Sequence, residues 1–196
     1  MGKTHESLDE HLIDWIGAQS MFFVATAPQS VRGLVNVSPK GPIGTFAVLG
    51  PRRVAYLDFF GSGAETVAHL RENGRIVVMF CAFTGPPRIL RLHGTGEPVW
   101  PSEPRFEELL GEAAFAGLTE VEEAQRAIVV VDVARIAESC GYGVPLMEHA
   151  GEREHFDLSK RKRLRTLGAA EMRQVEAARN ARSLDGLPAV PTGGSD

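Results

Sequence analysis

Strand-like segments follow one another along the first half of this chain, with only short turns between most of them. The clearest are Met21–Ala27, Val54–Phe59 and Ile76–Phe83, which are apolar and rich in β-branched and aromatic residues. A doubly wound parallel sheet would need a helix after nearly every strand, and the sequence does not provide them. Runs of strands joined by short turns, with helices inserted at the corners, instead favour an antiparallel barrel with peripheral helices.

The remaining elements follow from the same periodicities. Four more segments have the alternation or the β-branched composition of strands, at residues 34–38, 46–49, 88–99 and 127–133. Capping boxes formed by Ser7 with Glu10 and by Ser62 with Glu65 predict helices that begin at or near these serines. Two further helices are predicted at residues 106–116 and 159–182. We therefore expect a mainly β fold with helices at its periphery.

Length, charge and cysteine content exclude several classes of protein. With 196 residues, the chain suits one domain that buries a full hydrophobic core. Its net charge of −4 argues against nucleic acid as a partner, because phosphate binding needs a broad basic surface. No apolar run is long enough to span a bilayer, and the polar start is unlike a secretory signal. Cys81 and Cys140 are too few for a disulfide scaffold or a zinc cage, so we expect reduced thiols in a cytoplasmic protein without a metal site.

The chain divides into one folded unit and a C-terminal extension. Residues 1–150 contain every predicted strand and the N-terminal helix, and we expect them to form the barrel domain. Residues 151–185 are charged and rich in alanine, which predicts a helix packed on the barrel or on a dimer. The basic run at 160–163 is more typical of a solvated face or a dimer rim than of a nucleic-acid patch. Residues 186–196 have the composition of a disordered end.

One loop carries groups suited to an anion. Ser62 and Gly63 lie where a strand leads into a predicted helix. The first turn of a helix has unpaired N–H groups and the positive end of the helix dipole, both of which favour a negatively charged ligand. The alternative is a self-contained cap, in which Ser62 accepts from the Glu65 N–H and the Glu65 carboxylate reaches back. The spacing alone leaves both interpretations open.

A second group of polar residues lies in the segment VNVSPKG (Val35–Gly41). Asn36 and Ser38 alternate with valines, so they share one face of a strand that runs into a loop with Lys40. Such a strand offers backbone groups and a cation to a planar heterocycle. Taken alone, Lys40 is typical of a solvated loop, and Arg88 is typical of a strand surface. Taken together with the helix start, these cations suit a ligand that carries a phosphate group.

The succession of these elements resembles the flavin-binding half of pyridoxamine 5′-phosphate oxidase-like proteins. The resemblance covers roughly residues 20–100, through the segments VNVSPKG, VAYLDFFGSGAETVAHLRENGRIVVMFCAF and RILRLHGTGEPV. That family shows a strand ending in lysine, a hairpin, a strand leading to Gly-Ser, and a helix ending in a motif such as ENGR. The later segment CGYGVP (Cys140–Pro145) resembles one found in an uncharacterised subgroup of the same family.

The resemblance implies a six- to seven-stranded antiparallel split β-barrel that forms a homodimer, with two FMN molecules at the subunit interface. It implies that the VNVS segment and the strand after the hairpin line the isoalloxazine ring, with the lysine near the flavin and the substrate phosphate. The Gly-Ser loop would approach the flavin phosphate, and Arg88 would reach the cofactor from the strand after the Pro-Pro turn, within its own subunit or across the dimer. Tyr142 would either stack on the flavin or pack within its turn. The expected cofactor-binding residues are Val35, Asn36, Val37, Ser38, Lys40, Leu57, Asp58, Ser62, Gly63, Arg88 and Tyr142.

Three departures from the family pattern argue against the vitamin B6 oxidase reaction itself. Gly63 and Ala64 stand where the true oxidases carry an Arg-Lys pair after Gly-Ser, and Val35 stands in place of an arginine. The segment Arg153–His155 lacks the aromatic context of their Arg-x-His substrate motif. The expected function is therefore that of an FMN-dependent oxidoreductase acting on another small molecule.

Two alternatives share the same barrel. A deazaflavin-dependent reductase would need more cations around its groove than the sequence shows. A non-catalytic protein would hold flavin or haem, with His93 or His149 as the candidate haem ligand, although a lone strand histidine is mostly structural. No residue is identified as a necessary acid–base catalyst, since a flavin carries the redox chemistry and the protein positions it.

Overall fold

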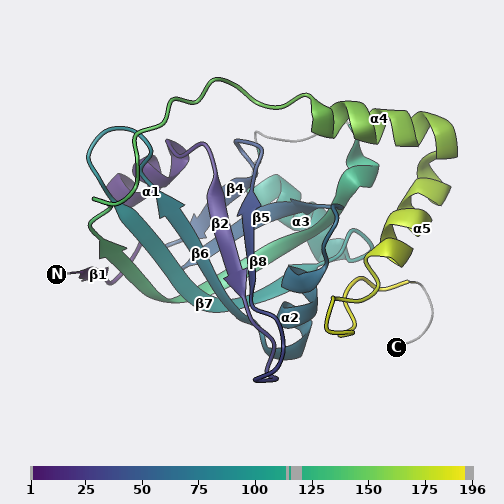
Figure 1. Ribbon diagram of the computed structural model, residues 1–196, viewed down its shortest axis with the longest axis horizontal. Coiled ribbons are helices and arrows are strands. Elements are labelled where there is room, and N and C mark those ends of the chain that lie inside the picture. The colour runs from purple at the N-terminus through teal and green to yellow at the C-terminus, as the bar shows by residue number, and fades with distance from the viewer. Residues whose placement is uncertain (1, 114, 116–120, 193–196) are drawn as a thin grey trace.

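The computed structural model describes residues 2–113, 115 and 121–192. Within these ranges eight strands form one antiparallel sheet (Figure 1). The strands are β1 (Lys3–His5), β2 (Phe22–Thr26), β3 (Asn36–Lys40), β4 (Phe46–Gly50), β5 (Arg53–Phe59), β6 (Arg75–Cys81), β7 (Ile89–Val99) and β8 (Gln125–Ser139). Their order is β3-β2-β6-β7-β8-β5-β4, with β1 paired to β8 outside this path. The predicted antiparallel β fold is confirmed. The additional strand β1 is polar and gave no apolar signal in the sequence.

The sheet curls around an apolar interior. On one edge β8 pairs with β5 through its first half and with β1 near its end, and on its other edge it pairs with β7. Alternate residues point inward, and Phe22, Val24, Val78 and Phe80 are each 4% exposed or less. Helix α1 (Glu10–Gly17) adds its buried Leu12 and Ile16 to this interior. Alternate residues of β2 and β6 therefore face this core.

The serine caps predicted for the first two helices are wrong. Helix α1 is capped by Asp9, whose side chain accepts from the Leu12 N–H at 2.9 Å. Helix α2 (Glu65–Asn73) begins three residues after Ser62, with Ala64 at its N-cap and no side-chain cap. The Glu65 carboxylate accepts instead from the Leu184 N–H at 3.2 Å. A distant backbone group has replaced the local capping partner.

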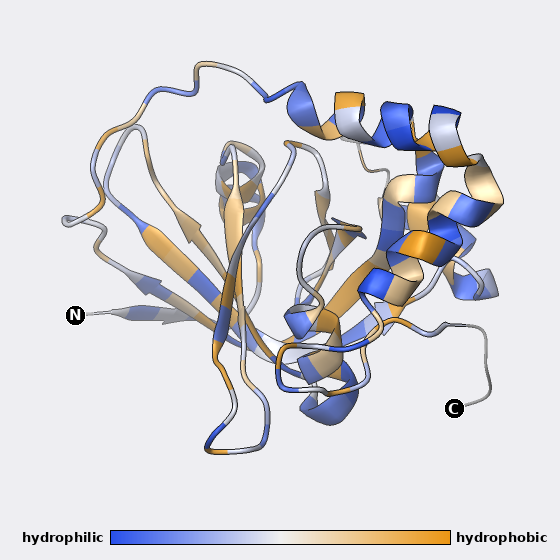
Figure 2. Cartoon of the chain, turned by 45° about the vertical axis from the view of Figure 1, so that its right-hand side comes forward, coloured by the Kyte–Doolittle hydropathy of each residue, from blue (hydrophilic) through white to orange (hydrophobic). Residues whose placement is uncertain are grey.

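Helices cover the outer face of β5 and β8. These are α3 (Pro104–Ala113), the short η1 turn (Glu122–Ala124), α4 (His155–Leu167) and α5 (Ala169–Arg179). Phe106 of α3 and Met172 of α5 pack in one buried cluster with Leu57 and Ile128 of the sheet. The predicted single C-terminal helix is two helices, because the chain turns at Gly168 with φ +76° (Figure 1). Both carry hydrophilic and hydrophobic residues in alternation, as expected for helices with one packed side (Figure 2).

The chain after α5 packs on α2. Ala189 and Val190 are 0% and 7% exposed and form a buried cluster with Phe60 and Val67. The Ala189 N–H donates to the Ala181 carbonyl at 2.9 Å, and the Val190 N–H donates to the Asn180 carbonyl at 3.0 Å. The disordered end expected from composition is therefore wrong for residues 186–192, while residues 193–196 lie outside the described ranges. The predicted helix at 106–116 ends at Ala113, and its last residues fall partly outside those ranges.

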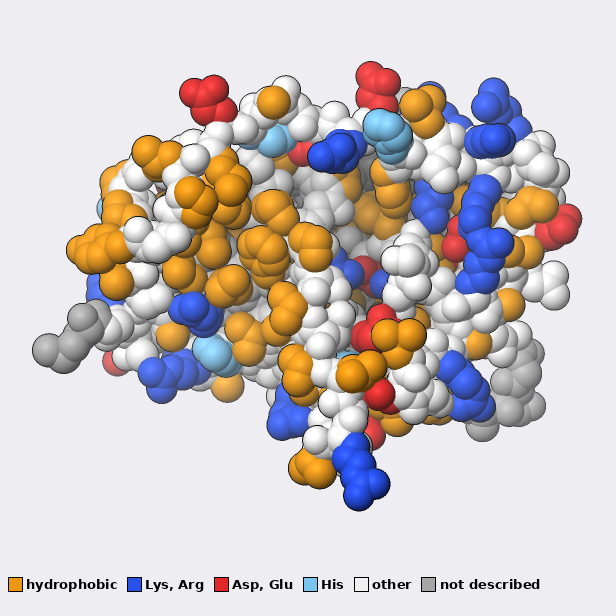
Figure 3. All heavy atoms as spheres, viewed as in Figure 1, with side chains coloured by type: hydrophobic (Ala, Val, Ile, Leu, Met, Phe, Trp, Pro, Cys, Tyr) orange, Lys and Arg blue, Asp and Glu red, His pale blue; other side chains and the backbone are white. Residues whose placement is uncertain are grey.

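The outer face of β2, β3 and β6 has no helix on it among the described residues. Val35 and Val37 are 73% and 63% exposed on this side, and Phe23, Ala25 and Met79 are half-buried. Figure 3 shows hydrophobic side chains gathered on the same side of the molecule. Contiguous apolar patches of this kind are typical of interaction surfaces. No helix of the described residues is long and apolar enough to cross a membrane.

Candidate functional site

A buried carboxylate joins β3 to β8. Asp58 of β5 is 2% exposed, and the Lys40 Nζ lies 2.7 Å from its Oδ1. The Arg126 guanidinium binds the other oxygen, with both Nε and Nη2 at 2.7 Å from Oδ2. Hydrogen bonds between a guanidinium and a carboxylate are charge-assisted and stronger than those between neutral groups. The structure thus brings two of the predicted residues, Lys40 and Asp58, into direct contact.

The two cations keep Asp58 ionised. Burial alone would raise the pKa of this carboxyl group, but Arg126 and Lys40 outweigh burial and lower the pKa from 3.8 to about 2. Asp58 is therefore negatively charged throughout the physiological pH range. It fixes the positions of both cations at the inner side of the barrel wall.

Arg126 also links the barrel to the loop before α2 and to the C-terminal extension. Its Nη1 donates to the Gly63 carbonyl and to the Asn180 Oδ1, both at 2.6 Å. Sequence analysis missed this residue, since the predicted strand began at Ala127. The sequence did offer one signal, because Arg126 directly precedes a β-branched apolar run that is expected to be buried. An arginine in such a position is seldom buried unless it is paired, so a partner carboxylate could have been expected. At 4% exposed, Arg126 is the central cation of the site.

A second polar cluster lies beside the first on the inner face of β3. The pairs Thr26↔Asn36 and Phe22↔Lys40 place Asn36, Ser38 and Lys40 on the same side as the inward residues of β2. Asn36 donates to the Thr66 Oγ1 at 3.0 Å and to the Thr26 Oγ1 at 3.3 Å, and accepts from Ser38 at 3.0 Å. The predicted polar face of this strand is therefore directed into the site.

His69 belongs to this second cluster through its contact with Thr26. It is fully buried, and its Nδ1 lies 2.9 Å from the Thr26 Oγ1. Burial lowers the pKa of His69, against the raising effect of Asp185, Glu72 and Glu65, so the ring is neutral at physiological pH. Its Nε2 has no hydrogen-bond partner among the described residues.

Three side chains donate hydrogen bonds to the backbone carbonyl groups of the loop Phe60–Ala64. The Lys160 Nζ donates to the Phe60 carbonyl at 2.6 Å, and Arg126 donates to that of Gly63 at 2.6 Å. Asn180 donates to the Gly61 carbonyl at 3.4 Å. In a trans peptide the C=O and the following N–H point in opposite directions. The N–H groups of residues 61, 62 and 64 therefore face away from these three donors, and none has an acceptor among the described residues.

Lys160 corrects the expectation for the basic run of α4. The run is predicted to form a solvated face or a dimer rim, but Lys160 is 7% exposed and lies 3.4 Å from the Glu176 carboxylate. Burial lowers its pKa, and Glu176 opposes this effect. Arg163 also binds Glu176, while Arg161 and Lys162 are exposed. One lysine of the run thus points inward to the loop.

The other residues predicted to contact the cofactor lie apart from this cluster within one chain. Val35 and Val37 are exposed on the outer face, and the Leu57 side chain packs under the helices rather than toward the site. Arg88 is near the far end of β7, with its guanidinium 5.3 Å from the Trp15 ring and 3.4 Å from Glu138. Tyr142 is 82% exposed.

The described part of the chain shows no candidate metal site. It contains no group of three or more His, Cys, Asp or Glu side chains arranged to hold a metal ion. His93 is half-buried on β7 and His149 is exposed, 3.4 Å from Glu152. The chemically distinctive part of the barrel is the buried pair of Asp58 and Arg126 with its attached loop.

Comparison with known proteins agrees with this arrangement of elements. The profile of the pyridoxamine 5′-phosphate oxidase family matches residues 8–140. A relative from Aspergillus flavus, the pyridoxamine 5′-phosphate oxidase family protein ustO, is 41% identical over 196 residues, which span 95% of this chain and 77% of the relative. The chain belongs to the pyridoxamine 5′-phosphate oxidase family. The resemblance noted in the sequence is confirmed.

Two solved structures support the fold. A variant form of HupZ from Group A Streptococcus superposes with a TM-score of 0.52 and 20% identity, covering 67% of this chain and 99% of that one. A second HupZ structure from the same organism gives a TM-score of 0.50 and 21% identity, covering 65% of this chain and 90% of that one. At this identity the likeness concerns the fold alone. The family members share a split β-barrel, and the predicted split-barrel fold is therefore confirmed.

Proposed function

We propose that the chain binds a flavin, specifically FMN, beside the Asp58 cluster and acts as a flavin-dependent oxidoreductase on a small molecule. The observation that carries the proposal is the placement of Lys40. Its ammonium group is held by Asp58, while Asn36 and Ser38 occupy the same inner face of β3. An ammonium group has three donors, and Asp58 accepts only part of that capacity. Lys40 thus offers a fixed cation to the polar edge of a flavin ring.

The loop before α2 fits the phosphate of FMN. The N–H groups of residues 61, 62 and 64 face away from the side chains that hold the loop, at the positive end of a nine-residue helix. The Glu65 carboxylate lies against this loop: its Oε2 would be 2.5 Å from a Cβ added at Gly63. Phosphate binding therefore requires the Glu65 side chain to turn away.

The exposed apolar face supports the homodimer that the sequence predicted. Val35 and Val37 are unsuited to solvent on a strand whose other face carries the polar cluster. A second copy that covers this face would bury both valines and would bring partner side chains to the edge of β3. Arg88, which is remote from the cluster within one chain, would then be available to the partner's site.

Each residue of the cluster has a defined task in this proposal. A bound flavin supplies hydride or electron transfer, and the side chains hold and polarise it. Asp58 stays ionised and keeps Lys40 in place, and Arg126 fixes the loop through the Gly63 carbonyl. The free thiols Cys81 and Cys140 are consistent with a cytoplasmic setting.

The test is a titration of the purified protein with FMN, riboflavin and a deazaflavin, followed by absorbance and calorimetry. We expect one FMN per chain, a dimer by light scattering, and at least about tenfold weaker binding of riboflavin, which lacks the phosphate. Lys40→Met should weaken both flavins about equally, because it acts on the ring. Lys162→Met, an exposed lysine outside the site, should change neither.

Three outcomes would overturn parts of the proposal. If FMN and its analogues all fail to bind, the chain is not a flavoprotein. Equal affinity for FMN and riboflavin would remove the loop as the phosphate site. Tighter binding of the deazaflavin would replace FMN as the cofactor.

A further inference from the structure

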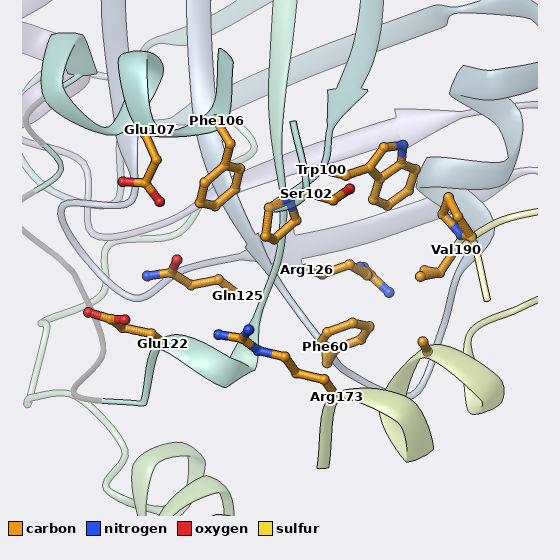
Figure 4. A pocket seen from close by; sticks show the side chains of 13 residues that line it. Phe60, Trp100, Ser102, Phe106, Glu107, Glu122, Gln125, Arg126, Arg173 and Val190 are labelled. Carbon is orange, nitrogen blue, oxygen red and sulfur yellow. The ribbon is translucent and has the colours of Figure 1, made fainter. Parts of the chain in front are cut away.

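A cavity of about 440 Å³ lies among α3, η1, the start of β8, α5 and the C-terminal segment. Figure 4 shows the side chains that line it. The cavity shares Arg126 and Phe60 with the loop described above, but Asn36, Ser38, Lys40 and Asp58 do not line it. It is thus a space separate from the Lys40 and Asn36 side of the cluster that adjoins the same loop, and its volume is within the usual range for small-molecule pockets.

One part of the cavity is apolar and aromatic. Phe60 and Phe106 are 6% and 2% exposed, and Trp100 is half-buried beside them. Figure 4 shows Trp100, Phe60 and Val190 together on one side of the space. Aromatic walls of this kind favour a flat or compact apolar group, because stacked and edge-on ring contacts add to simple burial.

The other part of the cavity holds polar groups without partners. Gln125 is 9% exposed, yet its side-chain amide has no hydrogen-bond partner among the described residues. Figure 4 shows it on the same side as Glu107, Glu122 and the Arg173 guanidinium. None of these three charged side chains forms an ion pair with another described residue. The fully buried side-chain N and O atoms without a partner do not include those of Gln125, so its amide faces the open cavity, where a ligand can bind it.

We propose that this cavity is a second ligand site, for a small zwitterion with an aromatic or other compact apolar end, the chemistry of an aromatic α-amino acid or a short peptide. The carboxylate pairs with Arg173, the ammonium group lies between Glu107 and Glu122, and the Gln125 amide binds the polar backbone of the ligand. The apolar end packs among Phe60, Trp100 and Phe106. A phosphate-bearing or polyanionic ligand is disfavoured by the two glutamates at the same end.

The arrangement couples the cavity to the loop. A ligand in the cavity contacts Phe60, whose carbonyl is held by Lys160, and Arg126, whose guanidinium holds the Gly63 carbonyl. Occupancy of the cavity therefore restrains both ends of the loop from behind. Binding itself does not require a flavin, so the site can be tested whether or not the cofactor proposal holds.

The experiment measures binding of three matched compounds to the full chain without added flavin, by calorimetry and by ligand-observed NMR. L-tryptophan carries both charges, tryptamine lacks the carboxylate, and indole-3-propionate lacks the ammonium group. We expect one saturable site for L-tryptophan and about tenfold weaker binding of each analogue, since each has lost one charged contact. Saturating FMN should not displace L-tryptophan.

Two variants assign the contacts. Arg173→Ala should weaken L-tryptophan and indole-3-propionate about tenfold and leave tryptamine unchanged. Arg179→Ala, which removes an exposed arginine of the same helix outside the cavity, should change none of the three. Gln125→Met should weaken L-tryptophan while leaving the melting temperature unchanged or raising it, because the Gln125 amide forms no hydrogen bond with another described residue that the substitution would remove. A structural role for Gln125 would give the opposite change in melting temperature.

Several results would overturn the assignment. They are the absence of saturable L-tryptophan binding, equal binding of the three compounds, displacement by FMN, and equal effects of Arg173→Ala and Arg179→Ala. A fall in melting temperature for Gln125→Met would also contradict it, since the amide would then have a partner inside the fold.

Discussion

Replacing Arg126 with methionine is the sharpest test of how this site is held together. Methionine keeps much of the side-chain length but leaves Asp58 with one cation instead of two, and leaves the Gly63 carbonyl and the Asn180 Oδ1 without their donor. Removing one partner of a buried ion pair costs about 3–5 kcal/mol, because the remaining charge stays buried. For a chain of this size that corresponds to a fall of roughly 6–20 °C in melting temperature.

The pKa of Asp58 gives an independent measure of the same interaction. Its fall from 3.8 to about 2 corresponds to roughly 2.5 kcal/mol of stabilisation at neutral pH, since one pH unit is worth about 1.4 kcal/mol. Because the folded pKa is depressed, this contribution is present above about pH 4 and is lost as the pH falls toward 2. The remainder of the expected cost comes from the unpaired carbonyl and amide groups.

The assay is urea unfolding of the wild type and Arg126→Met at about pH 7 and about pH 3. The difference in unfolding free energy should be largest at the higher pH and should shrink at the lower one, as Asp58 of the variant becomes protonated. Arg105→Met is the control, because Arg105 forms an ion pair with Glu97 at 2.6 Å on the surface. Its cost should stay below about 1 kcal/mol.

A double variant completes the test. In the Asp58→Asn background, Arg126→Met should cost clearly less than in the wild type, because no buried carboxylate is left without a partner. A cost for Arg126→Met below about 1 kcal/mol at neutral pH, or the same cost in both backgrounds, would refute the reasoning.

Two further predictions concern the C-terminal extension. Lys160→Met should speed amide hydrogen exchange in residues 60–64 and weaken FMN binding about tenfold. Lys162→Met on the same helix should do neither. Unchanged hydrogen exchange in Lys160→Met would show that Lys160 does not hold the loop. Ala189→Asp should destabilise the protein by at least about 2 kcal/mol in thermal or urea unfolding, because it places an unpaired charge at a fully buried position. Thr192→Asp, at an exposed position, should be neutral, and equal stability of both variants would mean that this segment is not packed.

The strands could be predicted because their signal is local. Alternation along β3 gave the shared face of Asn36 and Ser38, whereas Lys40, expected in the following loop, is the last residue of the strand on the same face. Alternation could not orient Leu57, which only the family resemblance had placed at the cofactor, because every residue from Val54 to Phe59 is buried and β5 shows no alternation between its two faces. For a strand that is packed on both sides, the sequence shows where the strand lies but not which of its faces each side chain is on.

The contacts that hold the site could not be read from spacing. Arg126 lies 68 residues from Asp58, and Lys160 lies 100 residues from the carbonyl that it binds. In a run of basic residues, only the tertiary arrangement decides which one turns inward. The Glu65 cap failed for a similar reason, since Leu184, at a separation of 119 residues, supplies the N–H that its carboxylate accepts. Local motifs show which hydrogen-bonding groups are available, and the tertiary fold determines which groups they bind.

In the proposed function, the same selection of partners by the tertiary fold would allow a loop without its own cations to bind an anion. The Arg-Lys pair that true oxidases carry after Gly-Ser is Gly63-Ala64 in this chain, so no positive side chain projects from those two loop positions. Arg126 and Lys160 instead bind the carbonyls of Gly63 and Phe60, which directs the N–H groups of residues 64 and 61 to the opposite side of the loop. Each cation is also paired with a buried carboxylate, Arg126 with Asp58 and Lys160 with Glu176. Charge supplied through the backbone is weaker than a direct ion pair but is fixed in position. In this proposal, FMN affinity therefore depends on residues of β8 and α4 that do not touch the cofactor, and the loss of either cation should weaken FMN more than riboflavin. A loss that is equal for both ligands would show that these cations only stabilise the fold.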